Sequence, residues 1–294
     1  MNLPSVNIKQ LLEAGVHLGH KTSRWNPKMD KFIFGSKDSI HIIDLVQTLE
    51  MINSALIQIH KCVAAGGSIL FVSTKKQATD TVSALAKETS QYYVNHRWLG
   101  GMLTNWNTIS NSIKRYKKLS EDLKSEETGF TKKENLKMGI QRDKLERSLG
   151  GISEMKKIPD MIFIIDTNIE ELAVKEALKL KIPIIAIVDT NSDPTGINFP
   201  IPGNDDARRA INLYCDLIKQ TIIDAKNNIK EQTQTNSDDA ENNKINENTT
   251  PKETDKTQVK ADLKKKSKNN IGEKEPKKKS MTILEKIKKI ASKK

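Results

Sequence analysis

The sequence predicts an α/β fold with a parallel sheet flanked by helices, and three observations support this prediction. Residues 160–165 and 182–188 are apolar, β-branched runs on either side of a helical pattern at 168–180, which is the arrangement of a βαβ unit. Residues 68–73 form a further apolar run, followed by a helical pattern at 75–88. Continuous apolar strands suit a sheet that is covered on both faces, so we expect helices on both sides.

The N-terminal segment is expected to begin with an amphipathic helix at 7–14, which Gly15 ends. Short strands at 32–34 and 40–43 and a helix at 46–65 come later. Between them we expect a loop whose basic residues and one aromatic suit contacts with an RNA backbone, unless the aromatic only anchors the loop on the core. The residues of this loop are His17, His20, Lys21, Arg24, Trp25 and Lys28.

The turn after residues 68–73 lies where a nucleotide-binding enzyme places its phosphate loop. It contains neither the G-x-G-x-x-G pattern nor a GKS or GKT sequence. Thr74 and Gln77 predict a capping box for the helix at 75–88. Lys75 and Lys76 are expected to project from the start of this helix, where they either meet phosphate or remain solvated.

Residues 95–106 hold an unusual concentration of special residues, directly after a predicted strand at 92–94. Trp98 and Trp106 are two of the three tryptophans in the chain, and His96, Arg97 and a glycine pair lie with them. A planar cation beside flat rings suits phosphates and nucleobases. The alternative is a turn whose tryptophans only fill the core.

Two helical runs, at 104–124 and 131–149, follow this motif and predict an antiparallel coiled-coil hairpin. Apolar residues of the first run step by three and four positions, and Thr131 with Glu134 predicts a capping box for the second. Further along, residues 199–202 form a last strand that its prolines restrict to a sheet edge, and Asn204 is expected to cap a helix reaching about residue 226.

The composition separates a folded segment from a charged tail. The chain has a net charge of +12, and residues 231–294 contribute 17 lysines and 11 acidic residues but no Phe, Trp or Tyr. We therefore expect disorder from residue 231 onward. Excess positive charge favours RNA or an acidic membrane surface, or serves solubility alone. Cys62 and Cys215 form no metal-binding pair and no apolar run approaches the ~20 residues of a membrane span, so we expect a cytoplasmic protein.

Six collinear motifs between residues 5 and 225 resemble the bacterial small-subunit ribosomal protein S2 family. They lie at 15–20, 25–29, 71–75, 96–106, 188–194 and 201–206. The resemblance implies a Rossmann-like, flavodoxin-like domain in two parts, 1–103 and 151–230, with the coiled-coil hairpin inserted at 104–150. It also implies a non-enzymatic protein that requires no cofactor. Its implied partners are small-subunit ribosomal RNA at the head–body junction, the large ribosomal protein S1 and neighbouring small-subunit proteins, with no membrane and no small-molecule substrate.

Within this resemblance we expect a set of basic and aromatic residues to face RNA. These are Arg24, Trp25, Lys28, Lys75, Lys76, His96, Arg97, Trp98, Trp106, Lys114, Arg115, Lys132 and Lys133. In the tail, residues 256–294 carry a net charge of +11, and 281–291 place their apolar residues on one helical face. We expect this arm to fold against ribosomal RNA or a neighbouring protein; the alternatives are binding to a membrane surface and a solvated tail without a partner.

A structural zinc or magnesium site is expected from His20, Asp189 and Asp205. Asp189 ends a predicted strand and Asp205 starts a helix after the next connection, so both can converge on the loop that carries His20. The alternative is that Asp205 caps the helix and His20 is a satisfied core histidine. A Rossmann-type enzyme is the rival function, because Asp166 and Asp189 follow strands at the edge where such folds bind ligands; the missing glycine pattern argues against it.

Overall fold

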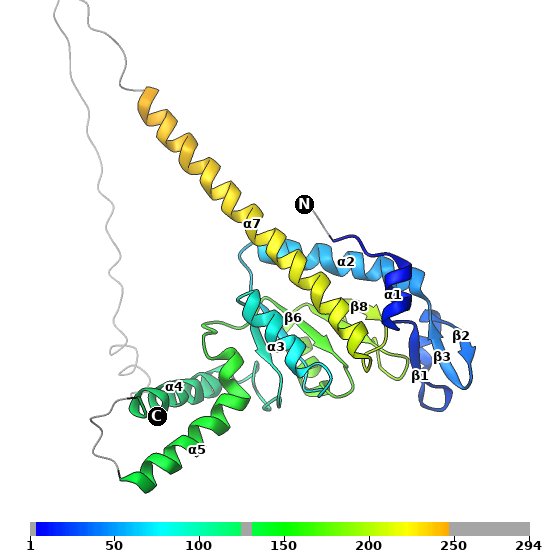
Figure 1. Cartoon of the computed structure of the whole chain (residues 1–294), viewed down its shortest axis with the longest axis horizontal. Helices are drawn as coiled ribbons and strands as arrows, with labels where there is room; N and C mark the ends of the chain where they lie inside the picture. Colours follow the sequence, from blue (N-terminus) through cyan, green and yellow to red (C-terminus); the bar gives the residue numbers. More distant parts are fainter. Residues whose placement is uncertain (1–3, 125–130, 247–294) are drawn as a thin grey trace, which may run out of the picture. The chain divides into compact units, whose positions relative to one another are not determined.

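A five-stranded parallel sheet forms the centre of the computed structural model, which describes residues 4–124 and 131–246 (Figure 1). Its strands lie in the order β5-β4-β6-β7-β8, which is the flavodoxin-like order of doubly wound sheets. The predicted α/β fold with a parallel sheet is confirmed, and β8 lies at an edge, as its prolines require. The strands are β4 (Ile69–Val72), β5 (Tyr92–Val94), β6 (Met161–Ile165), β7 (Ile184–Val188) and β8 (Phe199–Pro202).

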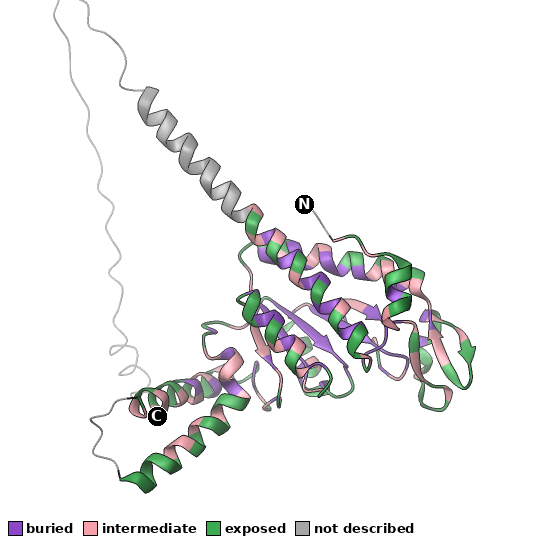
Figure 2. Ribbon diagram, viewed as in Figure 1, coloured by how far each residue is buried: buried purple, intermediate pink, exposed green. Residues whose placement is uncertain are grey.

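Successive side chains of a strand point to opposite faces of the sheet. Both faces of this sheet are buried, each in its own hydrophobic core. Phe71 lies in a core shared with α2 (Leu45–Ala64) and α3 (Thr79–Glu88), whereas Leu70 lies in a second core shared with α6 (Glu171–Leu180). The central strands are buried along their length (Figure 2). Burying one such side chain contributes ~1.5–3 kcal/mol, so the apolar runs of the sequence hold the layers together.

The N-terminal segment forms a three-stranded antiparallel sheet after α1 (Ile8–Ala14). Its strands β1 (Leu18–Lys21), β2 (Ile33–Lys37) and β3 (Ile40–Ile43) lie in the order β1-β3-β2. Helix α1 ends as expected at Gly15, whose φ of 78° lies in the left-handed region. The loop expected around residues 18–21 is instead a strand, because these residues pair with β3, about 20 positions away.

The start of α3 differs from the prediction. The helix begins at Thr79 rather than at residue 75, and its first residue is preceded by Ala78, which makes no capping hydrogen bond through its side chain. The backbone N–H of Thr74 donates to Oε1 of Glu170 at 2.6 Å. The predicted capping box is therefore wrong, since a residue far away in the sequence takes the place of the local partner.

Two helices, α4 (Trp106–Asp122) and α5 (Lys132–Leu149), pack against each other where a helical pair was predicted (Figure 1). The capping box of α5 is confirmed. Oγ1 of Thr131 accepts the backbone N–H of Glu134 at 3.4 Å, and Oε2 of Glu134 accepts the backbone N–H of Thr131 at 2.9 Å. A single 3-10 turn, η3 (Gly150–Ile152), then returns the chain to the sheet.

The last described helix, α7 (Arg208–Asn246), covers the first core with its N-terminal half. It continues past residue 226, where the prediction ended it. The disorder expected in the tail stays a prediction. The rest of the tail, with the predicted arm at 281–291, lies outside the described residues. The described residues up to 244 belong to one compact unit. Among the described helices there is no candidate for a membrane span.

Candidate functional site

A cluster of charged side chains occupies the carboxyl edge of the parallel sheet, where doubly wound folds bind their ligands. The segments after β4, β6, β7 and β8 bring Lys75, Asp166, Asp189 and Asp205 to this edge, and β1 adds His20. His20, Asp189 and Asp205 were predicted to converge. They do so, since one ligand atom from each lies within 4.8 Å of the others.

Lys75 is at the centre of this cluster instead of projecting into solvent. Its Nζ lies 2.8 Å from Oδ1 of Asp205, 2.7 Å from Oδ1 of Asp206 and 3.0 Å from Oδ2 of Asp166, and its side chain is only 9% exposed. Burial alone would lower the pKa of Lys75, but the surrounding carboxylates outweigh burial and raise that pKa. Lys75 therefore stays charged, and its charge is already matched.

His20 joins β1 to the end of β7. Its Nδ1 lies 2.9 Å from Oδ2 of Asp189, and its backbone N–H donates to Oγ1 of Thr190 at 2.9 Å. Its other ring nitrogen, Nε2, lies 3.6 Å from Oδ2 of Asp206. The hydrogen bond to Asp189 is the largest cause of a raised pKa for His20, although partial burial opposes it.

The cluster holds more carboxylates than cations, and this excess of negative charge favours a bound positive ion. Burial and the charges of Asp166 and Asp189 raise the pKa of Asp205, although Lys75 opposes them. Within the described part of the chain, Oδ2 of Asp205 is buried without a hydrogen-bond partner. An imidazole and two carboxylates with a free oxygen are a donor set that fits zinc, with water completing the shell. The residues present therefore fit the predicted metal.

The motif at 95–106 is organised by a carboxylate that the sequence analysis did not single out. Oε1 of Glu176, on α6, accepts Nε1–H of Trp98 at 3.1 Å and the backbone N–H of Gly101 at 2.8 Å. Oε2 accepts the backbone N–H groups of Leu103 at 2.9 Å and Thr104 at 3.0 Å, and the Thr104 hydroxyl at 3.1 Å. Burial alone would raise the pKa of Glu176, but these hydrogen bonds lower it. No sequence pattern distinguishes Glu176 from other helix glutamates.

Two residues of the set predicted to face RNA are not available on the surface. Trp98 is 6% exposed and lies in the second core, with its N–H bonded to Glu176. Lys75 is enclosed by carboxylates. Both are corrections to the predicted set, because in each case the side chain is turned inward by partners from distant parts of the chain.

A family model described as ribosomal protein S2 matches residues 11–225, which include the whole parallel sheet and the charged cluster. The chain belongs to the ribosomal protein S2 family. Three relatives named small ribosomal subunit protein uS2 show the extent of the similarity, each aligned over 224 residues that make up 76% of this chain. The protein of Parvibaculum lavamentivorans is 59% identical over 88% of its own length, that of Caulobacter vibrioides 58% over 84%, and that of Agrobacterium fabrum 57% over 88%.

Membership of the S2 family gives the chain its role. It is a structural constituent of the small ribosomal subunit, acts in translation in the cytoplasm and is not an enzyme. The rival prediction of a Rossmann-type enzyme is therefore wrong. The acidic residues at the sheet edge, on which that prediction relied, surround Lys75 and His20 instead.

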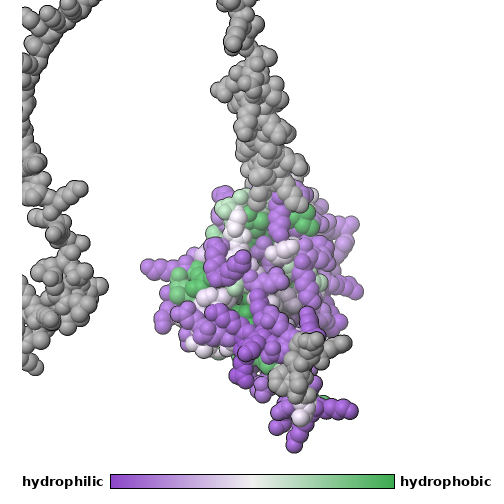
Figure 3. Space-filling model, turned by 90° about the vertical axis from the view of Figure 1, so that its left-hand side faces the viewer, coloured by the Kyte–Doolittle hydropathy of each residue, from purple (hydrophilic) through white to green (hydrophobic). Residues whose placement is uncertain are grey.

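The remaining predicted residues of this S2-family protein lie on the surface, apart from Trp106, which is half-buried against the second core. Arg24 ends the 3-10 helix η1 (Thr22–Arg24), and the ring of Trp25 next to it lies 5.5 Å from that of His41. Lys28, in the 3-10 helix η2 (Pro27–Phe32), is paired with Asp193 at 2.7 Å. The face seen in Figure 3 is largely hydrophilic, with only scattered apolar groups. The other exposed members are Lys76, His96, Arg97, Lys114, Arg115, Lys132 and Lys133.

Proposed function

We propose that the chain binds small-subunit ribosomal RNA through exposed cations and aromatic rings in two regions, one after β1 and one before α4. This proposal rests on the unpaired guanidinium groups of Arg24 and Arg97. Both are exposed, and within residues 4–124 and 131–228 neither has a hydrogen bond or an ion pair. Free guanidinium groups near the flat rings of Trp25 and His96 suit phosphates and unpaired bases.

The helices α4 and α5 extend this basic surface. We propose that they form the antiparallel coiled-coil hairpin of residues 104–150, inserted between the two parts of the α/β domain at 1–103 and 151–230. Four exposed cations, Lys114, Arg115, Lys132 and Lys133, are the groups that meet phosphate there. Nη2 of Arg115 donates to Oε1 of Gln141 at 3.4 Å across the helix pair, which leaves its other donors for RNA.

Family membership supports the finer parts of the same proposal. They are a position at the head–body junction on the solvent side of the subunit, docking of ribosomal protein S1, and contacts with neighbouring small-subunit proteins. Family membership does not extend to the tail; from its charge and apolar pattern alone we propose that the basic arm binds ribosomal RNA or a neighbouring protein.

We also propose that His20, Asp189 and Asp205 hold a structural zinc or magnesium ion, with zinc favoured by the imidazole ligand. A bound cation would offset the excess of carboxylates and tie β1 to the sheet edge. Metal analysis of purified, chelator-washed protein should find about one equivalent, and Asp189→Asn should lose it. Asp193→Asn, outside the cluster, is the matched control. If chelator-washed protein contained no bound zinc or magnesium, the proposed metal site would be refuted.

The RNA proposal is tested with Arg24→Ala/Arg97→Ala in the full chain. Co-sedimentation with small subunits is measured as the salt concentration rises, with Lys61→Ala/Lys179→Ala as a control of equal charge change. For binding to single strands, the slope of log K against log salt should fall by about 0.7 for each phosphate that the variant no longer neutralises. Incorporation that matches the control at every salt concentration contradicts the proposal.

A further inference from the structure

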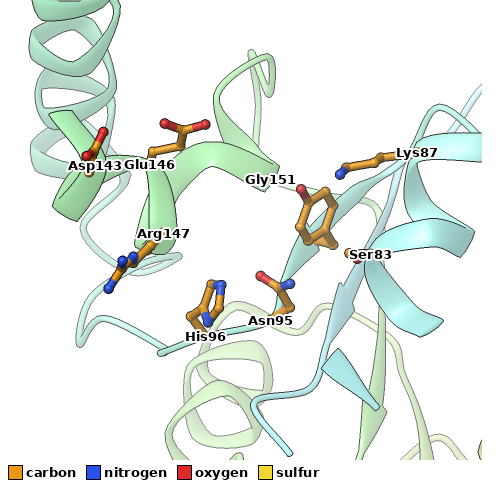
Figure 4. Close-up of a pocket in the computed structure, with 9 residues that line it drawn as sticks. Ser83, Lys87, Asn95, His96, Asp143, Glu146, Arg147 and Gly151 are labelled. Atoms are coloured by element: carbon orange, nitrogen blue, oxygen red, sulfur yellow. The ribbon is translucent and has the colours of Figure 1, made fainter. Parts of the chain in front are cut away.

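A polar cavity of about 370 Å³ lies between α3, the end of β5 and the last turns of α5 (Figure 4). Every residue of its lining except Gly151 carries a polar side-chain group. The side chains that matter for its chemistry are Lys87, Tyr93, Asn95, His96, Glu146 and Arg147. Of these, only His96 belongs to the RNA-facing set described above.

The cations of this cavity have no acidic partner. Lys87 from α3 and Arg147 from α5 stand on opposite walls (Figure 4). Both are exposed, and neither forms an ion pair or a hydrogen bond with any described residue. The Lys87 ammonium lies over the ring of Tyr93, 5.9 Å from its centroid. Asp143, which also lines the cavity, is paired with Arg142 at 2.6 Å, so Lys87 and Arg147 remain as two unmatched cations that suit an anion.

The two walls are held at a fixed spacing by a close backbone approach. A Cβ atom added to Gly151, in η3, would lie 2.1 Å from the carbonyl oxygen of Tyr93 and 2.8 Å from its ring. The turn that ends α5 is therefore packed directly on β5. The backbone on both sides is therefore already in place, so filling the site orders mainly side chains.

We propose that this cavity binds a single unpaired nucleotide of RNA, an inference that rests on the RNA-binding function proposed above. Its volume lies at the lower end of the ~300–1,000 Å³ of small-ligand pockets, as a nucleotide requires. The phosphate pairs with Lys87 or Arg147, and the base lies against the rings of Tyr93 and His96. An apolar anchor of a partner protein would meet polar or charged side chains over most of the lining, with the ring of Tyr93 as the exception.

The acceptors in the lining distinguish a nucleotide from a bare phosphate. Nδ2 of Asn95 donates to the carbonyl oxygen of Thr79 at 3.4 Å, which leaves Oδ1 to accept. Glu146 is a second acceptor, exposed and without an ion-pair partner in the described chain. Its carboxylate repels a bare phosphate but accepts N–H groups of a base. The cavity is therefore selective for the whole nucleotide.

The test uses the full chain and a fluorescein-labelled single-stranded RNA hexamer of sequence ACACAC. Anisotropy titrations compare Lys87→Ala/Arg147→Ala with Lys61→Ala/Lys179→Ala, which removes the same charge from exposed positions outside the cavity. Without a charge-assisted hydrogen bond to phosphate, the cavity variant should bind roughly tenfold or more weakly than the control. Circular dichroism checks that both variants are folded. Ultraviolet crosslinking followed by mass spectrometry should place a nucleotide adduct on Tyr93 or His96.

Equal affinities of the two variants, or adducts only on peptides outside the cavity, would overturn the proposal. Inorganic phosphate should compete no better than chloride at equal ionic strength, and stronger competition would reduce the site to a phosphate site and overturn it too. The two proposals fail differently. If the wild-type protein enters subunits but the two variants bind the hexamer equally, only the cavity proposal is refuted. If the wild-type protein binds neither subunits nor RNA, both proposals are refuted.

Discussion

Replacing Glu176 by glutamine tests whether this carboxylate holds the motif at 95–106 together. The carboxylate accepts five hydrogen bonds, two on Oε1 and three on Oε2. Glutamine keeps one accepting oxygen and turns its amide N–H₂ toward N–H donors, so at least two hydrogen bonds are broken in either orientation. At about 1 kcal/mol for each broken hydrogen bond, and more for the donors left facing each other, Glu176→Gln should cost roughly 2–4 kcal/mol of the free energy of unfolding.

The pH dependence of the same variant gives an independent check. The pKa of Glu176 is lower in the folded than in the unfolded chain, because hydrogen bonds to the carboxylate outweigh burial. The contribution of the Glu176 carboxylate to the free energy of unfolding is therefore complete at neutral pH, and it is lost as the pH falls through the lowered pKa of the folded state. Urea denaturation followed by tryptophan fluorescence at pH 7 and pH 4 should show a smaller loss of stability on acidification in Glu176→Gln than in wild type.

Glu171→Gln is the matched control for both measurements. It lies on the same helix and forms an ion pair with Lys175 at 2.5 Å, with both side chains about two-thirds exposed. Such a pair on a helix surface is worth about 0.2–0.5 kcal/mol. If Glu176→Gln unfolded within about 0.5 kcal/mol of Glu171→Gln at pH 7, the reasoning about the motif would be refuted.

Three further changes have expected outcomes. Gly151→Ala should destabilise the protein by roughly 1–3 kcal/mol in thermal or urea unfolding, because its Cβ meets the Tyr93 carbonyl at 2.1 Å, whereas Gly139→Ala, with open space around it in α5, should stabilise by up to ~1 kcal/mol. Thr131→Ala removes the capping box and should lower hydrogen-exchange protection of the first turns of α5 by roughly fivefold; unchanged protection would contradict the role of the cap. Truncation after residue 230 should leave a folded protein that enters subunits with less tolerance of salt, and unfolding of this truncated protein would contradict the domain boundary at residue 230.

The sequence by itself determined the elements whose cause is local. Strands β5 and β8 have the predicted bounds, and the apolar runs of β4, β6 and β7 lie where they were expected, within one or two residues. The capping box of Thr131 and Glu134 formed as predicted. In each case the deciding interaction is either the repeat of apolar side chains along a strand or a hydrogen bond within four residues, and both can be recognised in the chain without knowing the fold.

Only the tertiary structure decided where the polar side chains point. Thr74 bonds to Glu170 instead of its predicted capping partner, Lys75 turns inward to Asp205, and Trp98 turns inward to Glu176, each across more than 70 positions of the chain. A buried polar group must find a partner of matching charge or hydrogen-bonding type, and the fold, rather than sequence distance, sets which partners are near. The convergence of His20, Asp189 and Asp205 was predictable because a parallel sheet gathers its carboxyl ends at one edge. Glu176 was not, because on a helix surface its neighbours depend on how the segment before α4 packs against α6.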